Sequence, residues 1–145
     1  MKSIRLDLLP SYSKLQLAEH QLERAVRLLL DEEDTISAIT LAGAAEEILG
    51  KLVELRGGAH SLQKFIEECV EGGKQRGEEW KGSDFADMAN YFRNELKHYS
   101  DGQDVTVTPN LAYDLIDRAV ENLLALGVEE FEQLRRYRSA RHWPY

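Results

Sequence analysis

The 145-residue chain is predicted to be all-α, an up-and-down helical bundle of four principal helices plus short accessory helices. Apolar residues recur at helical spacing along nearly the whole chain, and strand-like alternation is confined to Val105–Thr108. An acidic turn at 31–34 separates the first two helical segments, and Gly or Pro separates the others. The length suits one domain with one core. We therefore treat residues 1–145 as a single domain, with an N-terminal arm at 1–12 and a C-terminal tail at 139–145.

The first two helices are expected to form a helical hairpin. The first begins at Ser13, whose hydroxyl forms a capping box with Gln16, and runs to about Leu30. The second spans about 35–56 and ends at Gly57–Gly58, because glycine adopts the left-handed conformation that closes a helix. The residues expected in the core are Leu15, Ala18, Leu22, Ala25, Val26 and Leu29 of the first helix and Ile39, Ala42, Ala45, Leu49, Leu52 and Val53 of the second.

The third and fourth helices are expected to be shorter. Ser61 is the predicted cap of the third helix, which stops at Gly72–Gly73. After a glycine-bearing connection, Ser83 or Asp84 caps the fourth helix. The apolar residues expected to face the core are Leu62, Phe65, Ile66, Cys69 and Val70 of the third helix and Phe85, Met88, Phe92 and Leu96 of the fourth.

Two more helices complete the predicted bundle. Thr108 precedes Pro109 at the first position of the fifth helix, where the missing N–H of proline costs nothing, and Gly127 closes this helix. The last helix spans about Val128–Arg138. The fifth helix is expected to direct Leu111, Leu115, Ile116, Ala119, Leu123 and Leu124 to the core.

Composition excludes several classes of protein. The formal net charge is -8, from 18 Lys and Arg against 26 Asp and Glu, which argues against broad, charge-driven binding to a long nucleic acid. The single cysteine, Cys69, cannot form an intramolecular disulfide and fits a reducing cytoplasm. No apolar run approaches the roughly 20 residues that span a bilayer, and the N-terminus does not resemble a secretory signal. We expect a cytoplasmic protein without a membrane anchor.

The C-terminal segment allows two interpretations. Arginines interleaved with aromatic residues can hold phosphates and stack on bases. The same pattern is typical of a last helical turn followed by a frayed tail, which is the interpretation we favour. The arginines are Arg135, Arg136, Arg138 and Arg141, and the other residues of interest are Tyr137, His142, Trp143 and Tyr145.

The fourth helix carries the main candidate site. On a helical wheel its apolar residues fall on one side, and its polar residues Arg93, Asn94, Lys97 and His98 fall on the opposite, solvent-facing side. Arg93 and His98 are about 140° apart around a straight helix, so one helix does not easily bring both to one phosphate. They can meet if the helix unwinds near Lys97, or if a second copy of this face approaches across a two-fold axis.

The segment R-N-E-L-K-H at 93–98 resembles the R-x4-6-H motif of HEPN domains. Arg93 and His98 match the two defining positions, and Asn94 matches a polar position common after the arginine. The resemblance implies an all-helical bundle that forms a homodimer, so that paired motifs line one cleft. It also implies a metal-independent ribonuclease of toxin or defence type that uses no cofactor. Some family toxins carry H-x-Y, where a nucleotidyltransferase-type antitoxin modifies the tyrosine. Here Tyr99 directly follows His98, which weakens that implication but leaves Tyr99 near the expected cleft.

Ribonuclease chemistry needs only a base, an acid and a cation, because RNA supplies its own nucleophile in the 2'-hydroxyl. His98 is the expected base, and His98 of the partner subunit is the expected acid. Arg93 would bind two phosphate oxygens and stabilise the transition-state charge, while Asn94 would orient the phosphate or His98. Lys97 and Tyr99 are supporting candidates. The expected product carries a 2',3'-cyclic phosphate, and DNA is expected to be inert.

The second helix carries a further signal in Gly43 and Gly50, which share one side of the helix. A glycine inside a helix costs roughly 1 kcal/mol relative to alanine, so two on one side indicate another helix backbone passing close by. Glu46 and Glu47 flank this side and are candidates to orient Arg93 or His98. Close packing beside a solvated acidic edge explains the same residues and is the interpretation we favour.

Two rival functions remain. Glu95 and His98 form an E-x-x-H unit like those of di-iron bundles, but the wheel directs His98 away from the interior where such metals bind. The stronger rival is a non-catalytic HEPN-like module that recognises RNA, a nucleotide or a partner protein. Phosphate-binding loops, dinucleotide fingerprints, nucleophile elbows and zinc-ligand spacings are absent from the sequence.

Overall fold

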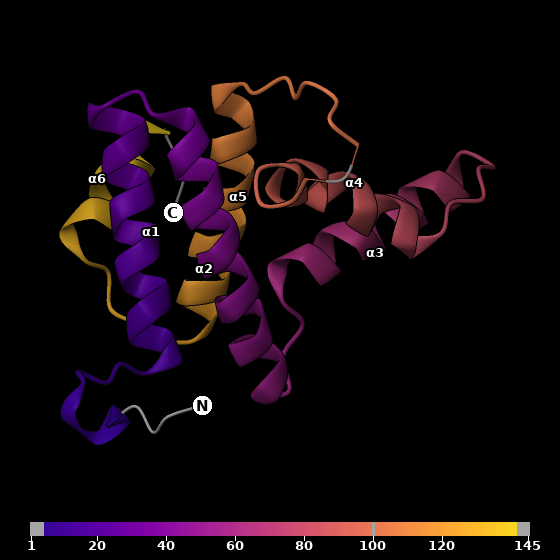
Figure 1. Ribbon diagram of the computed structural model, residues 1–145. Coiled ribbons are helices and arrows are strands. Elements are labelled where there is room, and N and C mark those ends of the chain that lie inside the picture. The colour runs from indigo at the N-terminus through magenta and orange to yellow at the C-terminus, as the bar shows by residue number, and fades with distance from the viewer. Residues whose placement is uncertain (1–4, 100, 142–145) are drawn as a thin grey trace.

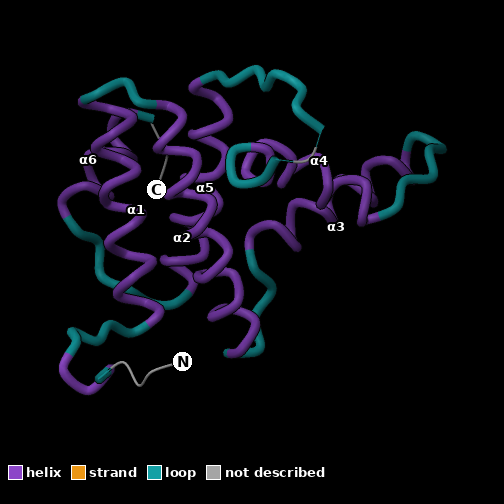
Figure 2. The backbone as a smooth tube through the Cα atoms, in the orientation of Figure 1, coloured by secondary structure: helices purple, strands orange, loops and turns teal. Residues whose placement is uncertain are grey.

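The computed structural model describes residues 5–99 and 101–141, and all regular structure in these ranges is helical (Figures 1 and 2). The prediction of an all-α bundle is confirmed. The segment 105–108, with its strand-like alternation, lies in the connection between two helices. The elements in chain order are η1 (Leu6–Leu8), α1 (Lys14–Asp31), α2 (Thr35–Leu55), α3 (Ser61–Gln75), α4 (Gly82–Glu95), α5 (Pro109–Ala125) and α6 (Glu132–Ala140).

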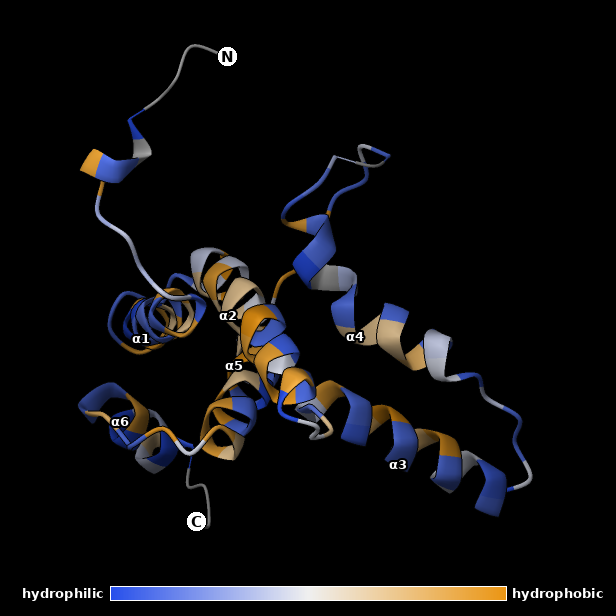
Figure 3. Ribbon diagram, turned by 90° about the horizontal axis from the view of Figure 1, so that it is seen from below, coloured by the Kyte–Doolittle hydropathy of each residue, from blue (hydrophilic) through white to orange (hydrophobic). Residues whose placement is uncertain are grey.

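The bundle consists of α1, α2, α5 and α6, and α3 and α4 form a separate pair beside it. α1 and α2 run antiparallel. α5 lies along α2 in the same direction, and the ends of the two helices meet where Arg56, after α2, donates a hydrogen bond to the carbonyl of Leu126, after α5, at 2.7 Å. α6 returns alongside α1, where Arg136 pairs with Asp31. α3 and α4 pack on each other and project from one side of the bundle (Figures 1 and 3).

The hydrophobic core lies between α1, α2, α5 and α6. Most of the core residues predicted for the first, second and fifth helices are buried. Leu124 is an exception, because it is 37% exposed, while Val120, which the prediction omitted, is completely buried. The apolar stripe of α5 is therefore centred slightly differently from the predicted one. The largest fully buried apolar side chains are Tyr137, Leu22, Ile39, Leu49, Ile116, Leu123, Leu134, Val26 and Val120.

Several predicted helix ends are confirmed. Ser13 and Gln16 form the capping box, with the backbone N–H of Gln16 donating to Ser13 Oγ at 3.0 Å and that of Ser13 donating to Gln16 Oε1 at 2.8 Å. Gly57 and Gly127 follow α2 and α5 with φ values of +81° and +73°, the left-handed region that favours glycine. Pro109 is the first residue of α5.

Two predicted N-caps are wrong by one to three positions. The cap of α3 is His60, whose Nδ1 accepts a hydrogen bond from the backbone in the first turn, and Ser61 is the first helical residue. α4 begins at Gly82, so Ser83 and Asp84 lie inside its first turn. There the Asp84 carboxylate accepts a hydrogen bond from the backbone N–H of residue 81 at 3.2 Å. Asp84 therefore stabilises the helix start from within the helix.

The predicted end of the third helix at Gly72–Gly73 is also wrong, since α3 continues to Gln75. Gly73 is buried, and a Cβ at this position would lie 2.7 Å from Cδ1 of Trp80. The residue with the left-handed backbone is Gly77, at φ +78°. Gly73 therefore makes room for an indole ring, and Gly77 reverses the chain toward α4.

The last helix begins later than predicted. α6 starts at Glu132, not near Val128, and extends to Ala140, so the predicted tail from 139 is partly helical. Val128 and Phe131 lie before the helix and pack against the core. Phe131 is extended, with φ -100° and ψ 167°, and serves as the N-cap. Residues 1–4 of the predicted arm and 142–145 of the predicted tail lie outside the described residues.

α4 has a weak apolar face. Met88, predicted to face the core, is 59% exposed, and Phe85 is half-buried. Leu96 packs against the core, while the side chain of Phe92 lies outside what the structure describes. Polar contacts therefore carry much of the attachment of α4. In the described part of the chain, no helix combines the length and apolar character needed to cross a membrane.

Candidate functional site

Arg93 lies against α2 instead of facing solvent. Its side chain is 11% exposed, and its Nη1 donates to Oε2 of Glu46 at 3.0 Å. The Glu46 side chain is itself 4% exposed. The prediction that Arg93 occupies a solvent-facing side is therefore wrong. A wheel drawn for one helix assumes one buried face, whereas α4 lies beside α2 and buries a second, polar face there.

The two glycines of α2 accommodate side chains. A Cβ at Gly43 would lie 2.7 Å from Cδ of Arg93 and closer still to its Cγ. A Cβ at Gly50 would lie 3.5 Å from both Cβ of His60 and Nδ2 of Asn122, which is ordinary contact. The close approach predicted on this side of α2 exists at Gly43, but the neighbour is the stem of Arg93 and not a helix backbone.

Glu47 extends the ion pair toward the end of α4. Its Oε2 lies 3.9 Å from Nη1 of Arg93 and 3.8 Å from Nζ of Lys97, and its side chain is 62% exposed. Exposed ion pairs at this distance contribute about 0–1 kcal/mol to stability. Glu47 therefore influences where the side chains of Arg93 and Lys97 lie more than it stabilises the fold. The buried Glu46 is different, since removing one partner of a buried pair leaves the other charge uncompensated. Glu46 therefore sets the position of the Arg93 guanidinium.

His98 lies beyond the end of α4. The helix ends at Glu95, and the backbone N–H groups of Lys97 and His98 both donate to the carbonyl of Asn94, at 3.1 and 3.0 Å, in a closing turn. His98 is exposed, as predicted, and Tyr99 beside it is 90% exposed. Within the described ranges no hydrogen bond or ion pair joins His98 to Arg93. A single subunit therefore does not bring these two residues together.

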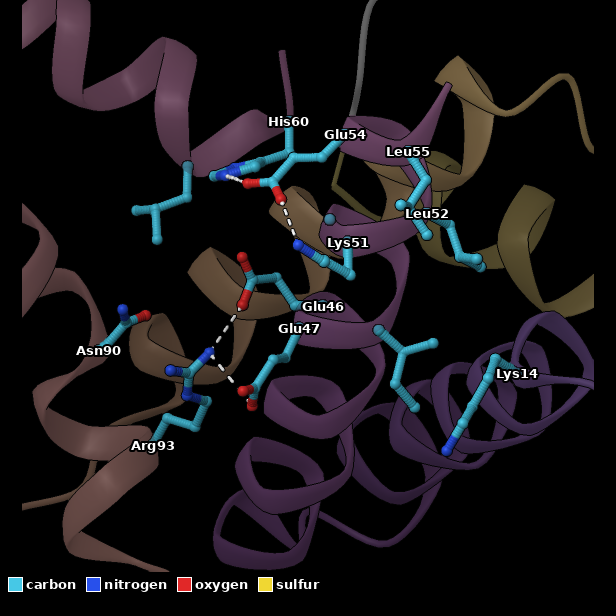
Figure 4. Close-up of a pocket in the computed structure, with 13 residues that line it drawn as sticks. Lys14, Glu46, Glu47, Lys51, Leu52, Glu54, Leu55, His60, Asn90 and Arg93 are labelled. Atoms are coloured by element: carbon cyan, nitrogen blue, oxygen red, sulfur yellow. Dashed lines mark hydrogen bonds and ion pairs between the residues drawn. The ribbon is translucent and has the colours of Figure 1, made fainter. Parts of the chain in front are cut away.

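An open pocket of about 560 Å³ lies beside Arg93, between α2, α3 and α4 (Figure 4). Arg93 and Asn90 line one wall, and a second charged group lines the far side. In that group, Glu54 accepts from Lys51 Nζ at 3.2 Å and lies 2.9 Å from Nε2 of His60. Hydrogen bonding from Lys51, with a smaller contribution from His60, lowers the pKa of Glu54. His98 does not line this pocket.

His60 belongs to the pocket but carries no signal in the sequence. Its Nδ1 accepts from the backbone N–H of Gln63 at 3.0 Å, so the neutral ring carries its proton on Nε2, which faces Glu54. The side chain is 18% exposed. The contact depends on the turn that directs α3 back across the end of α2.

Arg118 of α5 is the second residue that sequence reasoning missed. Its Nη2 donates to the backbone carbonyl of Ala89 in α4 at 3.3 Å. Burial lowers the pKa of its guanidinium, and Glu46 partly opposes this effect. A lone arginine beside an apolar stripe usually extends to solvent, so nothing in the sequence distinguished this one.

The C-terminal arginines make contacts within the subunit. The guanidinium of Arg141 lies 4.5 Å from the centre of the Tyr113 ring, a cation–π contact. These contacts attach α6 to the bundle, which disfavours a phosphate-binding role for the segment, while His142, Trp143 and Tyr145 lie outside the described residues. The pairs are Arg136 with Asp31, Arg138 with Glu130 and Arg141 with Asp117, and Arg135 donates to the carbonyl of Glu130.

The di-iron interpretation does not fit the geometry. It requires the histidine of the E-x-x-H unit in the bundle interior, whereas His98 is exposed in the turn after α4. Across the described residues, no three His, Cys, Asp or Glu side chains gather in a way that could hold a metal ion.

No protein family, curated protein or solved structure matches the chain. The likeness to HEPN domains therefore depends on the six residues 93–98 and on the helical context around them.

Proposed function

We propose that this protein is a metal-independent endoribonuclease of toxin or defence type that acts in the cytoplasm as a homodimer. One observation carries the proposal. The guanidinium of Arg93 is held in place by the buried carboxylate of Glu46 at 3.0 Å, and the same side chain lines an open pocket of about 560 Å³. A guanidinium that is pre-oriented at a pocket wall is suited to hold a phosphate group without further ordering.

The chemistry follows from RNA itself. His98 takes the proton from a 2'-hydroxyl, the 2'-oxygen attacks the adjacent phosphorus, and the bond from phosphorus to the 5'-oxygen breaks. His98 of the partner subunit gives a proton to that 5'-oxygen. Arg93 stabilises the charge on the phosphate oxygens, and Asn94 orients the phosphate. The products are a 2',3'-cyclic phosphate and a 5'-hydroxyl, so no cofactor enters the reaction.

A second copy of the chain is part of the proposal. Arg93 and His98 make no contact within one subunit, and His98 is exposed beyond the end of α4. The same helix and the turn after it expose the large side chains of Met88, Tyr91 and Tyr99, which are 59%, 47% and 90% accessible. Exposed large apolar side chains of this kind are available to an interaction site. A two-fold contact there would place two motifs in one cleft.

The resemblance also suggests an inhibitory partner. A nucleotidyltransferase-type antitoxin that modifies a tyrosine would find Tyr99 accessible, although this tyrosine stands one position closer to the histidine than in the family pattern.

A non-catalytic binding module is the second candidate, and the charge around Arg93 favours it. Glu46 and Glu47 already neutralise the guanidinium, at 3.0 and 3.9 Å, and the chain carries a net charge of -8. A phosphate must therefore compete with two carboxylates. In this alternative the dimer recognises RNA, a nucleotide or a protein without cleaving it.

Cleavage of a mixed RNA in the presence of EDTA distinguishes the two candidates. The ribonuclease is expected to cut RNA but not DNA of the same sequence, and Arg93→Lys and His98→Ala are expected to lose activity while remaining folded and dimeric. Arg24→Lys and His20→Ala are matched controls on α1, where Arg24 pairs with Glu32 and His20 is exposed. If the wild-type dimer leaves diverse RNAs intact yet binds a partner through this face, the enzyme proposal fails.

A further inference from the structure

α3 and α5 form the two walls of an open groove of about 530 Å³, to which α4 contributes Met88 and Ala89. We call it the α3–α5 groove. It lies where the α3–α4 pair leaves the bundle (Figure 1). None of the described residues lines both this groove and the pocket beside Arg93. The groove is therefore separate from the site proposed for the reaction.

Apolar side chains from three helices contribute to the groove. Phe65 of α3 is 39% exposed and Met88 of α4 is 59% exposed, so both offer apolar surface to a partner. Leu111 and Leu115 of α5 also line the groove, and Leu115 is buried. An apolar groove between helices is the kind of surface on which the apolar face of another helix packs.

The charged residues of the groove are mostly acidic. Four carboxylates face two cations, which gives the lining a formal charge of -2. Arg141 pairs with Asp117 at 2.9 Å from outside the lining, and even with this arginine the acids exceed the cations by one. The carboxylates are Glu68 on α3 and Asp114, Asp117 and Glu121 on α5, and the cations are Lys64 and Arg118.

Glu68 and Asp114 are the two carboxylates available to a partner. Both residues are exposed, and within the described ranges neither makes an ion pair or a side-chain hydrogen bond. Desolvation and then repulsion from Asp117 raise the pKa of Asp114, and the opposing effects of Arg118 and Arg141 do not cancel this shift. The two walls of the groove therefore each present a carboxylate that a cation from outside can pair with.

We propose that the α3–α5 groove binds a basic amphipathic helix of a partner protein. The apolar side of that helix packs on Phe65 and Met88, and lysines or arginines on its two flanks reach Glu68 on one wall and Asp114 on the other. Long basic side chains suit these positions, because their methylene stems cover apolar surface while their charged ends extend to the carboxylates. The same carboxylates repel phosphate, which disfavours nucleic acid and anionic lipid as occupants.

A second copy of this chain fits the groove less well than a different protein does. The arginine-rich helix of the chain is α6, but its Arg136 and Arg138 already pair with Asp31 and Glu130 within the subunit. The apolar side of α6 is buried in the core, where Tyr137 is completely enclosed. Docking α6 into another subunit would therefore break contacts that attach it to its own bundle.

Met88 also belongs to the surface proposed for the two-fold contact of the ribonuclease. Binding of the helix is therefore expected to compete with dimerisation and to reduce RNA cleavage, which would make the partner an inhibitor. This consequence rests on the proposed function, whereas binding of the helix to the groove does not.

A designed peptide serves as the probe. It has about 18 residues, with leucines at every third or fourth position and lysines on both flanks of that stripe. Fluorescence anisotropy measures its Kd at about 0.15 M ionic strength, where long-range attraction to the acidic chain is screened. The wild type is expected to bind with a Kd of about 1–100 μM. An isomer of the same composition without the helical periodicity is expected to bind at least about tenfold more weakly.

The double variant Glu68→Gln with Asp114→Asn tests the charge complementarity. It is expected to weaken binding of the peptide about tenfold, because both carboxylates lose their cationic partners. The matched control is Glu33→Gln with Glu129→Gln, which removes the same charge from exposed residues in the connections after α1 and α5. The control is expected to stay within about twofold of the wild type.

Met88→Ser tests the apolar contact and is expected to weaken binding about fivefold. Ile36→Ser on α2 is the control, because Ile36 is also 59% exposed but lies outside the groove. It is expected to bind the peptide like the wild type. Amide chemical shifts of the labelled protein locate the peptide, and changes are expected around Phe65, Met88 and Asp114.

Four outcomes would overturn the inference. They are a Kd above about 1 mM, equal binding of the aperiodic isomer, equal weakening by the Glu33 and Glu129 control, and shift changes away from the groove. A dimer that is weakened by Glu68→Gln with Asp114→Asn would instead assign the groove to a second copy. If the peptide occupies the groove and the wild type cleaves no RNA, the ribonuclease proposal fails and the helix-binding site stands.

Discussion

The stem of Arg93 in α4 passes directly over Gly43 in α2, so that a Cβ at position 43 would lie 2.7 Å from Cδ of Arg93. The contact is between a glycine inside a helix and the aliphatic part of a charged side chain. It lets the guanidinium reach the buried carboxylate of Glu46 one helical turn further along. The position of the candidate phosphate-binding group is therefore set by the absence of a side chain at residue 43.

Gly43→Ala is expected to displace Arg93 from its contact with Glu46. The added methyl group overpacks the site, which costs about 1–3 kcal/mol, partly offset by the better helix propensity of alanine. Ribonuclease activity is expected to fall with the displaced guanidinium. Urea unfolding and RNA cleavage measure the two effects.

Gly50→Ala is the matched control on the same side of α2. Its Cβ would make ordinary contacts at 3.5 Å, so stability is expected to stay unchanged or to rise by up to about 1 kcal/mol. If both substitutions change stability and activity equally, the close approach at Gly43 does not position Arg93.

Glu46→Gln is expected to destabilise the protein far more than Glu47→Gln. Glu46 is 4% exposed, and its loss leaves Arg93 without its buried partner, which costs about 3–5 kcal/mol. Glu47 is 62% exposed, so its neutralisation costs at most about 1 kcal/mol. Chemical denaturation at neutral pH measures both. Equal values for the two variants would show that the Glu46 pair is not buried in solution.

Tyr137 is expected to make the protein sensitive to alkaline pH. Its ring is fully buried, and its hydroxyl donates to Asp117, so burial and then this carboxylate raise its pKa well above the usual value. The folded state then keeps the proton that the unfolded chain loses above about pH 10. Stability is therefore expected to decline as the pH rises above about 10, because the unfolded state binds fewer protons there.

Tyr137→Phe tests the source of that decline. It removes the hydroxyl and leaves Asp117 short of one donor, so it is expected to cost about 1–3 kcal/mol at neutral pH. Its stability is expected to fall less steeply than that of the wild type between pH 9 and 11. Urea unfolding across this range gives both slopes, and parallel slopes would show that the Tyr137 hydroxyl is not the responsible group.

Local rules predicted much of the fold, because the relevant interactions lie within a few residues. The capping box of Ser13 with Gln16, the start of α5 at Pro109 and the left-handed Gly57 follow from side-chain chemistry and backbone sterics alone. The same rules gave a wrong helix end at Gly73. It marks a close contact with Trp80, which arrives from the next connection, and only the tertiary structure reveals it.

The candidate site was predicted less completely, since it depends on how α4 lies beside α2. The sequence identified Arg93, Glu46 and Glu47, which do lie together. It placed Arg93 in solvent, because a helical wheel represents only one packing partner. Arg118 was missed because its partial burial depends on a contact with the backbone of α4, and the local sequence around residue 118 contains no trace of that contact.

End-group analysis of the reaction products is the decisive test of the proposed ribonuclease activity. Wild-type protein is incubated with a defined RNA in EDTA, and mass spectrometry identifies the new ends, with Arg93→Lys, His98→Ala and the control His20→Ala treated alike. We expect 2',3'-cyclic phosphate and 5'-hydroxyl ends from the wild type and His20→Ala, loss of both from Arg93→Lys and His98→Ala, and no cut where the ribose is 2'-deoxy. Intact RNA with the wild type, or equal cleavage by His98→Ala, would contradict the proposed activity.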